Sequence, residues 1–193
     1  MSAVCVYCAS SFGLRKEFGE IAFETGRSIA KSGQTLVYGG ANVGLMGLVA
    51  DGALSEDGQV IGVLPEALSE KEIAHTGLSK LHIVGSMHER KALMNDLSDA
   101  FISLPGGAGT MEEMFEMWTW AQLGYHNKPS GLLNIAGYYD HLIAFLDQMV
   151  QAELIKPEMR EILIVETDPT RLLDRFRDYV PPKVHKWIKK GET

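Results

Sequence analysis

The chain has 193 residues, which allows one domain with a well-buried core and gives little reason to expect two. Its apolar share of 46% is ordinary for a globular protein, and its net charge of −7, from 18 basic and 25 acidic side chains, argues against nucleic acid as a partner. No apolar run approaches the ~20 residues of a membrane helix, and no basic segment precedes the first apolar residues, so we expect neither a membrane partner nor a signal peptide. The two cysteines are too few for a disulfide scaffold, so we expect a cytoplasmic protein.

Short apolar strands alternate with helix-like segments along the chain. The expected strands are residues 2–8, 35–38, 59–64, 81–84, 101–104, 131–135 and 162–165. The expected helices are residues 14–31, a segment ending near 54, one beginning near 86, and residues 110–123, 138–151 and 169–179, while 66–80 is polar and irregular. This alternation predicts an α/β fold, a Rossmann-like doubly wound parallel sheet with helices on both faces. We assign residues 1–180 to this single domain and 181–193 to a basic tail.

The two cysteines, Cys5 and Cys8, have the C-x-x-C spacing of redox and zinc sites. A redox pair usually begins a helix, and a zinc site needs two further ligands. Cys5 and Cys8 instead lie in an expected strand, where side chains three positions apart point to opposite faces. The sequence therefore favours two ordinary thiols over a redox or metal site.

Two glycine-rich turns, at residues 39–47 and 105–109, each follow an expected strand and precede a helix. Glycine lets a ligand approach the backbone closely, and the free N–H groups of a helix start attract an anion such as phosphate. Because the carboxyl ends of parallel strands meet at one edge of a sheet, we expect both turns to face one site. The first turn lacks the G-x-G-x-x-G spacing of a dinucleotide site, so a nicotinamide cofactor is not favoured.

The helix after the second turn begins with a pattern that has two interpretations. Thr110 and Glu113 have the spacing of a capping box, in which each side chain stabilises the helix start. Glu113 could equally be a catalytic carboxylate, and a helix N-terminus would favour its charged form, which suits a base. Glu112, Glu116 and Thr119 could line the same cleft.

Residues 86–91 begin another helix, with Ser86 and Glu89 as a second expected capping box. Arg90 and Lys91 follow in its first turns, where positive charge opposes the helix dipole. They are either solvated surface charges or groups whose positive charge is offset by a bound anion. None of the six histidines has the spacing of a metal-binding motif, so no metal is expected.

Residues 105–113, PGGAGTMEE, match the PGGxGTxxE signature of the Lonely Guy family, which the chain resembles over almost its whole length. Residues 39–47, 87–91 and 118–124 are similar to further motifs of that family, in the same order. One departure is Ala41, where many members have a third glycine. Members are cytokinin riboside 5′-monophosphate phosphoribohydrolases, long mislabelled as possible lysine decarboxylases.

The resemblance implies hydrolysis of the bond between purine N9 and ribose C1′ in AMP or an N6-substituted AMP, without a metal or cofactor. Arg90 and Glu113 would be the catalytic pair. The residues implied to contact the nucleotide are Glu72, Lys91, Gly106, Gly107, Gly109, Thr110, Met111, Glu112 and Thr119. The transition state should resemble an oxocarbenium ion, which Glu113 would stabilise while Arg90 positions the substrate or its phosphate.

Two other functions are weighed against this one. Decarboxylation of lysine with pyridoxal phosphate needs a Schiff-base lysine, and only Lys91 lies near the motifs, so this reaction is not favoured. A non-catalytic nucleotide or cofactor carrier could keep the phosphate-binding turns but would not need Glu113 together with Arg90.

The family resemblance also implies a homodimer. Four large apolar side chains surround the central helix more completely than one buried face requires: Met114, Met117, Trp118 and Trp120. This arrangement fits a helix that packs across a two-fold interface.

Overall fold

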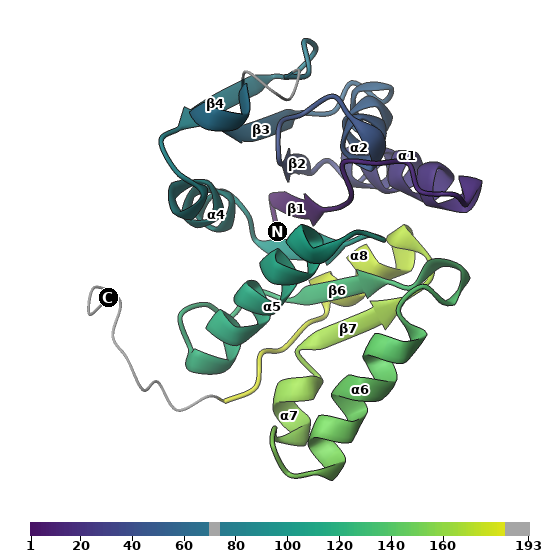
Figure 1. Cartoon of the computed structure of the whole chain (residues 1–193), viewed down its shortest axis with the longest axis vertical. Coiled ribbons are helices and arrows are strands. Elements are labelled where there is room, and N and C mark those ends of the chain that lie inside the picture. The colour runs from purple at the N-terminus through teal and green to yellow at the C-terminus, as the bar shows by residue number, and fades with distance from the viewer. Residues whose placement is uncertain (70–73, 184–193) are drawn as a thin grey trace.

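The computed structural model describes residues 1–69 and 74–183, and its core is one sheet of seven parallel strands (Figure 1). Their order across the sheet is β4-β3-β2-β1-β5-β6-β7. The strands are β1 Ala3–Tyr7, β2 Thr35–Tyr38, β3 Val60–Pro65, β4 Lys80–Val84, β5 Ala100–Ser103, β6 Ser130–Leu133 and β7 Leu163–Glu166. All the expected strands are confirmed, each with bounds close to those predicted.

Helices connect successive strands, as a parallel sheet requires. They are α1 Lys16–Lys31, α2 Gly44–Leu54, α3 Glu66–Ser69, α4 Met87–Asp96, α5 Ala108–Leu123, the 3₁₀ helix η1 Ile135–Gly137, α6 Asp140–Gln151, α7 Pro157–Arg160 and α8 Pro169–Arg177. The single-turn helices α3 and α7 were not predicted, because four residues are too short to show an apolar period. In the described part of the chain, no helix has the length and apolarity needed to cross a membrane.

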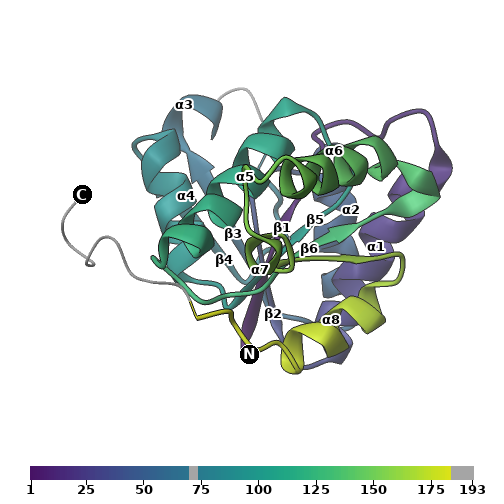
Figure 2. The ribbon, with the colours of Figure 1, turned by 90° about the horizontal axis from the view of Figure 1, so that it is seen from below.

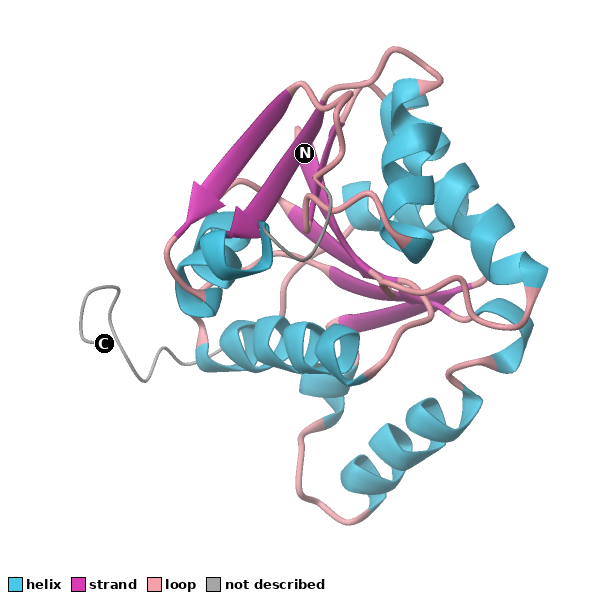
Figure 3. Ribbon diagram, turned by 45° about the horizontal axis from the view of Figure 1, so that its top comes forward, coloured by secondary structure: helices cyan, strands magenta, loops and turns pink. Residues whose placement is uncertain are grey.

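The sheet is covered on both faces, which confirms the doubly wound fold (Figures 2 and 3). Helices α1, α2 and α8 pack on one face, where Val4 and Val6 of β1 point. Helices α4 and α5 pack on the other face, where Cys5 and Tyr7 point. The alternation of side chains along β1 therefore divides one strand between two cores.

The cysteines follow this division, as the sequence predicts. Cys5 is buried in the core beneath α4 and α5, and Cys8 packs against the opposite core, just beyond the end of β1. Both are free thiols. Burial raises the pKa of each thiol far above its ordinary value, so both stay protonated.

The direction of winding reverses beside β1, which places a crevice at the centre of the sheet. From β1 the chain adds strands outward to β4, then returns to add β5, β6 and β7 on the other side. Tyr7 of β1 is level with Ser103 of β5, and the N–H of Leu104 donates to the Tyr7 carbonyl at 2.9 Å. The segments leaving these two strands thus start side by side, at the position where such folds bind ligands.

Candidate active site

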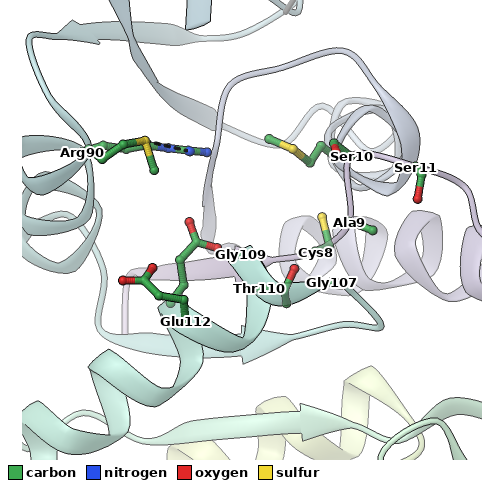
Figure 4. Close-up of a pocket in the computed structure, with 12 residues that line it drawn as sticks. Cys8, Ala9, Ser10, Ser11, Arg90, Gly107, Gly109, Thr110 and Glu112 are labelled. Carbon is green, nitrogen blue, oxygen red and sulfur yellow. Dashed lines mark hydrogen bonds between the residues drawn. The ribbon is translucent and has the colours of Figure 1, made fainter. Parts of the chain in front are cut away.

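A cavity of about 330 Å³ opens at this crevice (Figure 4). One wall is the segment from Cys8 to Ser11 that follows β1, together with Met46 of α2. The other walls come from Met87 and Arg90 of α4 and from the N-terminal turns of α5. Figure 4 shows Arg90 entering from one side while Thr110 and Glu112 face the cavity from another.

Arg90 is buried, with only 8% of its surface exposed. Its Nε donates to the Val63 carbonyl at 3.2 Å and its Nη2 to the Gly39 carbonyl at 3.4 Å. An added Cβ on Gly39 would lie 2.1 Å from Nη2, so only glycine lets the guanidinium rest against this backbone. The first glycine turn therefore reaches the same site as the second, as expected, by holding Arg90.

The positive charge of Arg90 is available to an anion. Its hydrogen bonds go to neutral acceptors, and no ion pair joins it to a carboxylate within residues 1–69 and 74–183. A buried guanidinium that makes no ion pair attracts anions strongly, because its environment screens charge poorly. For Arg90, the interpretation as a solvated surface charge is wrong.

Glu113 also lines the cavity, and its environment differs from the predicted one. Burial raises the pKa of its carboxyl group to about 7, although the charge of Arg90 opposes this shift. The expectation that the charged form of Glu113 would be favoured is therefore wrong, because desolvation of the carboxylate is the largest influence on its pKa. Near neutral pH the carboxyl group is present in both its protonated and ionised forms.

The predicted capping box of Thr110 and Glu113 is also wrong. Helix α5 begins at Ala108, its N-cap is Gly107, and no side chain caps it. Thr110 is a buried residue of the first turn, and the carboxyl group of Glu113 lines the cavity. Glu113 is thus not a cap, and the interpretation that remains for it is a functional one.

The N-terminal turn of α5 forms the base of the cavity. Gly107, Gly109 and Thr110 line it, while Gly106 lies just outside. An added Cβ on Gly106 would lie 2.1 Å from the Thr110 Oγ1, so a side chain cannot be placed there without moving the turn. Since no side chain caps this helix, its first N–H groups remain available to an anion.

Lys91 lies behind this cavity rather than in it. Its Nζ is 2.6 Å from Oε1 of Glu112 and 3.0 Å from Oε2 of Glu116, and its side chain is only 8% exposed. Burial lowers the pKa of Lys91, but the bonds to the two carboxylates outweigh this effect and the pKa is raised. The surface-charge interpretation is wrong here too, and the anions that Lys91 meets are carboxylates that link α4 to α5.

The start of α4 is largely as predicted. The Ser86 hydroxyl accepts from the N–H of Glu89 at 3.2 Å, so the predicted N-cap is confirmed. The Glu89 carboxylate accepts from the N–H of Gly85 at 2.8 Å, where a capping box would have it bond to Ser86.

Besides Lys91 and Gly106, two other residues implied by the family resemblance, Met111 and Thr119, do not line the cavity. Met111 packs toward the core formed by α5 and α6, and Thr119 is exposed further along α5. Glu72 lies outside the described residues. Conversely, Cys8, Ala9 and Met87 line the cavity although no site role was predicted for them, whereas Met46 belongs to the first glycine turn, which was expected to face the site. Applying the crevice rule to the end of the first strand would have indicated residues 8–11.

The apolar residues that suggested an interface on α5 are explained within one chain. Met114, Met117 and Trp118 are each at most 3% exposed, and Trp120 is half-buried. Met117 packs under the sheet, while the Trp118 indole donates to the Met159 carbonyl at 2.8 Å. Met114, Met117 and Trp118 therefore give no support for a dimer, because the sheet and the segments around α6 and α7 already cover them.

Comparisons with known proteins agree with this architecture. A family model described as "Possible lysine decarboxylase" matches residues 46–176. The chain is 47% identical over 178 residues to a probable cytokinin riboside 5′-monophosphate phosphoribohydrolase, LOGL9, of Oryza sativa subsp. japonica, covering 92% of this chain and 78% of that protein. It is 43% identical over 178 residues to the cytokinin riboside 5′-monophosphate phosphoribohydrolase LOG1 of Arabidopsis thaliana, covering 92% and 84%.

Among solved structures, the Moco carrier protein from Chlamydomonas reinhardtii has a similar fold. Its TM-score is 0.69 at 20% identity, and the match covers 92% of this chain and 96% of that one. At such low identity the likeness concerns the fold alone.

Proposed function

Because the chain belongs to the Lonely Guy family, we propose that it hydrolyses the bond between purine N9 and ribose C1′ in AMP or an N6-substituted AMP. The products are the free base and ribose 5-phosphate. The observation that carries this proposal is the cavity shared by Glu113, buried Arg90 and the uncapped start of α5. It combines an acid–base group, a cation without a carboxylate partner in the described residues, and an anion site.

In this proposal Glu113 acts at C1′. Departure of the base leaves positive charge on the ribose, and an ionised carboxylate beside C1′ stabilises that charge. The same carboxylate can orient a water molecule and accept its proton. A pKa of about 7 suits this role, because the base form is abundant at neutral pH and still accepts a proton readily.

Arg90 and the start of α5 position the substrate. The 5′-phosphate binds the N–H groups around Gly107 and Gly109, as anions do at helix N-termini. The Arg90 guanidinium, fixed by the Gly39 and Val63 carbonyls, holds the phosphate or the ribose from across the cavity. Binding energy gained at the phosphate then serves to orient C1′ against Glu113.

The remaining nucleotide contacts stay predictions from the family resemblance. Lys91 would act through Glu112, which lines the cavity, rather than by reaching the substrate directly. Contacts from Glu72, Met111 and Thr119 would need surfaces beyond this cavity. We also infer from the family a cytoplasmic location and a homodimer. Sedimentation of the purified protein tests the homodimer directly.

Product analysis tests the proposed reaction. Purified protein is incubated with AMP and with N6-isopentenyl-AMP, and free base and ribose 5-phosphate are followed by chromatography. Glu113→Gln and Arg90→Gln should each lower kcat/KM by ~100-fold or more, since each removes a group that acts on the transition state. Glu158→Gln, at an exposed position on α7, is the matched control and should keep full activity.

The result also decides between the hydrolase and a carrier. Release of base that depends on Glu113 and Arg90 establishes the hydrolase, and the ratio of the two rates gives its preference at N6. Tight nucleotide binding without any release would instead favour a carrier, a role named for the Chlamydomonas protein of the same fold.

A further inference from the structure

A second cavity, of about 250 Å³, lies next to the catalytic one. The two share Ala9, Ser11 and Gly107 in their walls. The second cavity is otherwise mainly apolar, lined among others by Phe12, Phe18, Leu45, Pro105 and Tyr138. The backbone at Gly107 is therefore the partition between an apolar cavity and the catalytic cavity.

Tyr138 is the C-cap residue of η1, and its side-chain hydroxyl group contacts the turn that contains Gly107. Its O–H donates to the Gly106 carbonyl at 2.6 Å. The ring packs edge-on against Phe18, with centroids 5.4 Å apart, and against Tyr139, with centroids 4.9 Å apart. The hydroxyl is thus held in place although the residue is 43% exposed.

Because a peptide group is planar, the hydrogen bond from Tyr138 to the Gly106 carbonyl also fixes the orientation of the Gly107 N–H. In a trans peptide the C=O of one residue and the N–H of the next point in opposite directions. Tyr138, which lines the second cavity, holds the Gly106 carbonyl, so the N–H of Gly107 lies on the opposite side of this peptide, away from the Tyr138 hydroxyl. Glycine at both positions leaves this peptide free to rotate unless something holds it.

The preceding part of the turn is held separately. The hydroxyl of buried Tyr139 donates to the Leu104 carbonyl, and the Leu104 N–H donates to Tyr7 of β1. Pro105 has no backbone N–H to be satisfied. Of the two tyrosine contacts, the one made by Tyr139 belongs to the core, while the one made by Tyr138 acts on the peptide next to the anion site.

We propose that Tyr138 is a positioning residue for the substrate phosphate: its hydroxyl holds the Gly106–Gly107 peptide so that the Gly107 N–H points at the bound anion. This inference rests on the proposed function, since it assigns the 5′-phosphate to the start of α5. Arg90, which is 8% exposed and lines the same cavity, supplies an independent sign that an anion binds there. Tyr138 itself lines the neighbouring cavity and acts through the turn.

Titration calorimetry with ribose 5-phosphate and with inorganic phosphate tests this role on Tyr138→Phe. The substitution removes one oxygen and keeps the ring packing, so Tm should fall by no more than about 4 °C. We expect the Kd of both anions to rise ~5- to 10-fold, because the Gly107 N–H is then no longer held in position and its hydrogen bond to the anion is weakened. The Kd of free adenine should stay unchanged. Tyr125→Phe, whose ring packs against Trp120 at the far end of α5, is the control and should alter neither anion.

Two results would overturn the inference. One is an unchanged Kd for both anions in Tyr138→Phe. The other is a fall in Tm comparable to that of Tyr139→Phe together with equal loss of adenine and phosphate binding, which would show a merely structural role. Because anion binding needs no turnover, a protein that binds phosphate through Tyr138 but releases no base would end the hydrolase proposal and leave this one standing.

Discussion

At the scale of single residues, burial decides the chemistry of Glu113. Its carboxyl group has a pKa of about 7 in the folded protein, against an ordinary value of 4.5. The folded state therefore binds this proton more tightly than the unfolded state does. The contribution to stability is fully present below pH 4.5 and is lost as the pH rises through 7, because folding then buries a charge.

Replacing Glu113 by glutamine should therefore stabilise the protein in a pH-dependent way. The neutral side chain avoids a burial cost on the order of 3 kcal/mol at pH 8, and less than about 1 kcal/mol at pH 5. We expect Glu113→Gln to raise Tm by roughly 5 °C or more at pH 8, with a much smaller rise at pH 5. Calorimetric melting of both proteins at the two pH values measures this. Equal shifts at both, or the same behaviour in Glu158→Gln, would contradict it.

At the scale of elements, two helices must be held in register to bring Arg90 of α4 and Glu113 of α5 to one cavity. Buried Lys91 provides this link through Glu112 and Glu116 of α5. A buried ammonium needs such partners, since its charge would otherwise be desolvated without compensation. The linking carboxylates also act on Glu113, because both raise its pKa.

Glu116→Gln should shift the pH dependence of kcat/KM. If ionised Glu113 is the base, kcat/KM rises about tenfold per pH unit below pH 7 and levels off above it. Loss of the Glu116 charge lowers the pKa of Glu113, so the rising part of the kcat/KM profile should move to lower pH. At pH 6, kcat/KM should then be a larger fraction of its constant value at high pH. Glu112 still holds Lys91, which limits structural damage.

The control for this experiment is Glu56→Gln. Glu56 also contacts two cations, Arg27 at 2.9 Å and Lys31 at 3.4 Å, but it lies away from the cavity. Breaking these contacts should leave the pH profile unchanged. The idea that Glu116 raises the pKa of Glu113 would be contradicted if the rising part of the pH profile stayed in place for Glu116→Gln, or if it moved equally for Glu56→Gln.

The elements also show what sequence patterns can and cannot predict. The apolar runs were sufficient to predict every strand, because a buried parallel strand needs few other signals. The start of α5 was placed at Thr110 because threonine and glutamate three positions apart look like a cap. In the structure Gly107 is the N-cap residue and has an extended backbone, and Glu113 lines the cavity instead of capping the helix. Tertiary burial, which no local pattern contains, thus changed both the role and the ionisation of one residue.

At the scale of the whole molecule, the site joins the two halves of the sheet. Residues 8–11 and the first glycine turn come from the half built on β1 to β4, whereas α5 follows β5. The sequence predicted that the two glycine turns share an edge but not that Cys8 and Ala9 belong to a wall of the site, because these two residues carry no motif that indicates a ligand. Their position follows only from the strand order, in which β1 and β5 are neighbours.

A ligand in this cavity should therefore slow amide hydrogen exchange in both halves of the sheet at once. We expect ribose 5-phosphate to slow amide hydrogen exchange in residues 8–11 and 106–110 and around Arg90, since it binds across the crevice between them. Residues in β7, at one edge of the sheet, and in α8 should exchange at unchanged rates. Exchange mass spectrometry with and without the ligand measures this pattern. Protection confined to one half would show that the ligand contacts only one wall of the cavity. This result would contradict binding across the crevice.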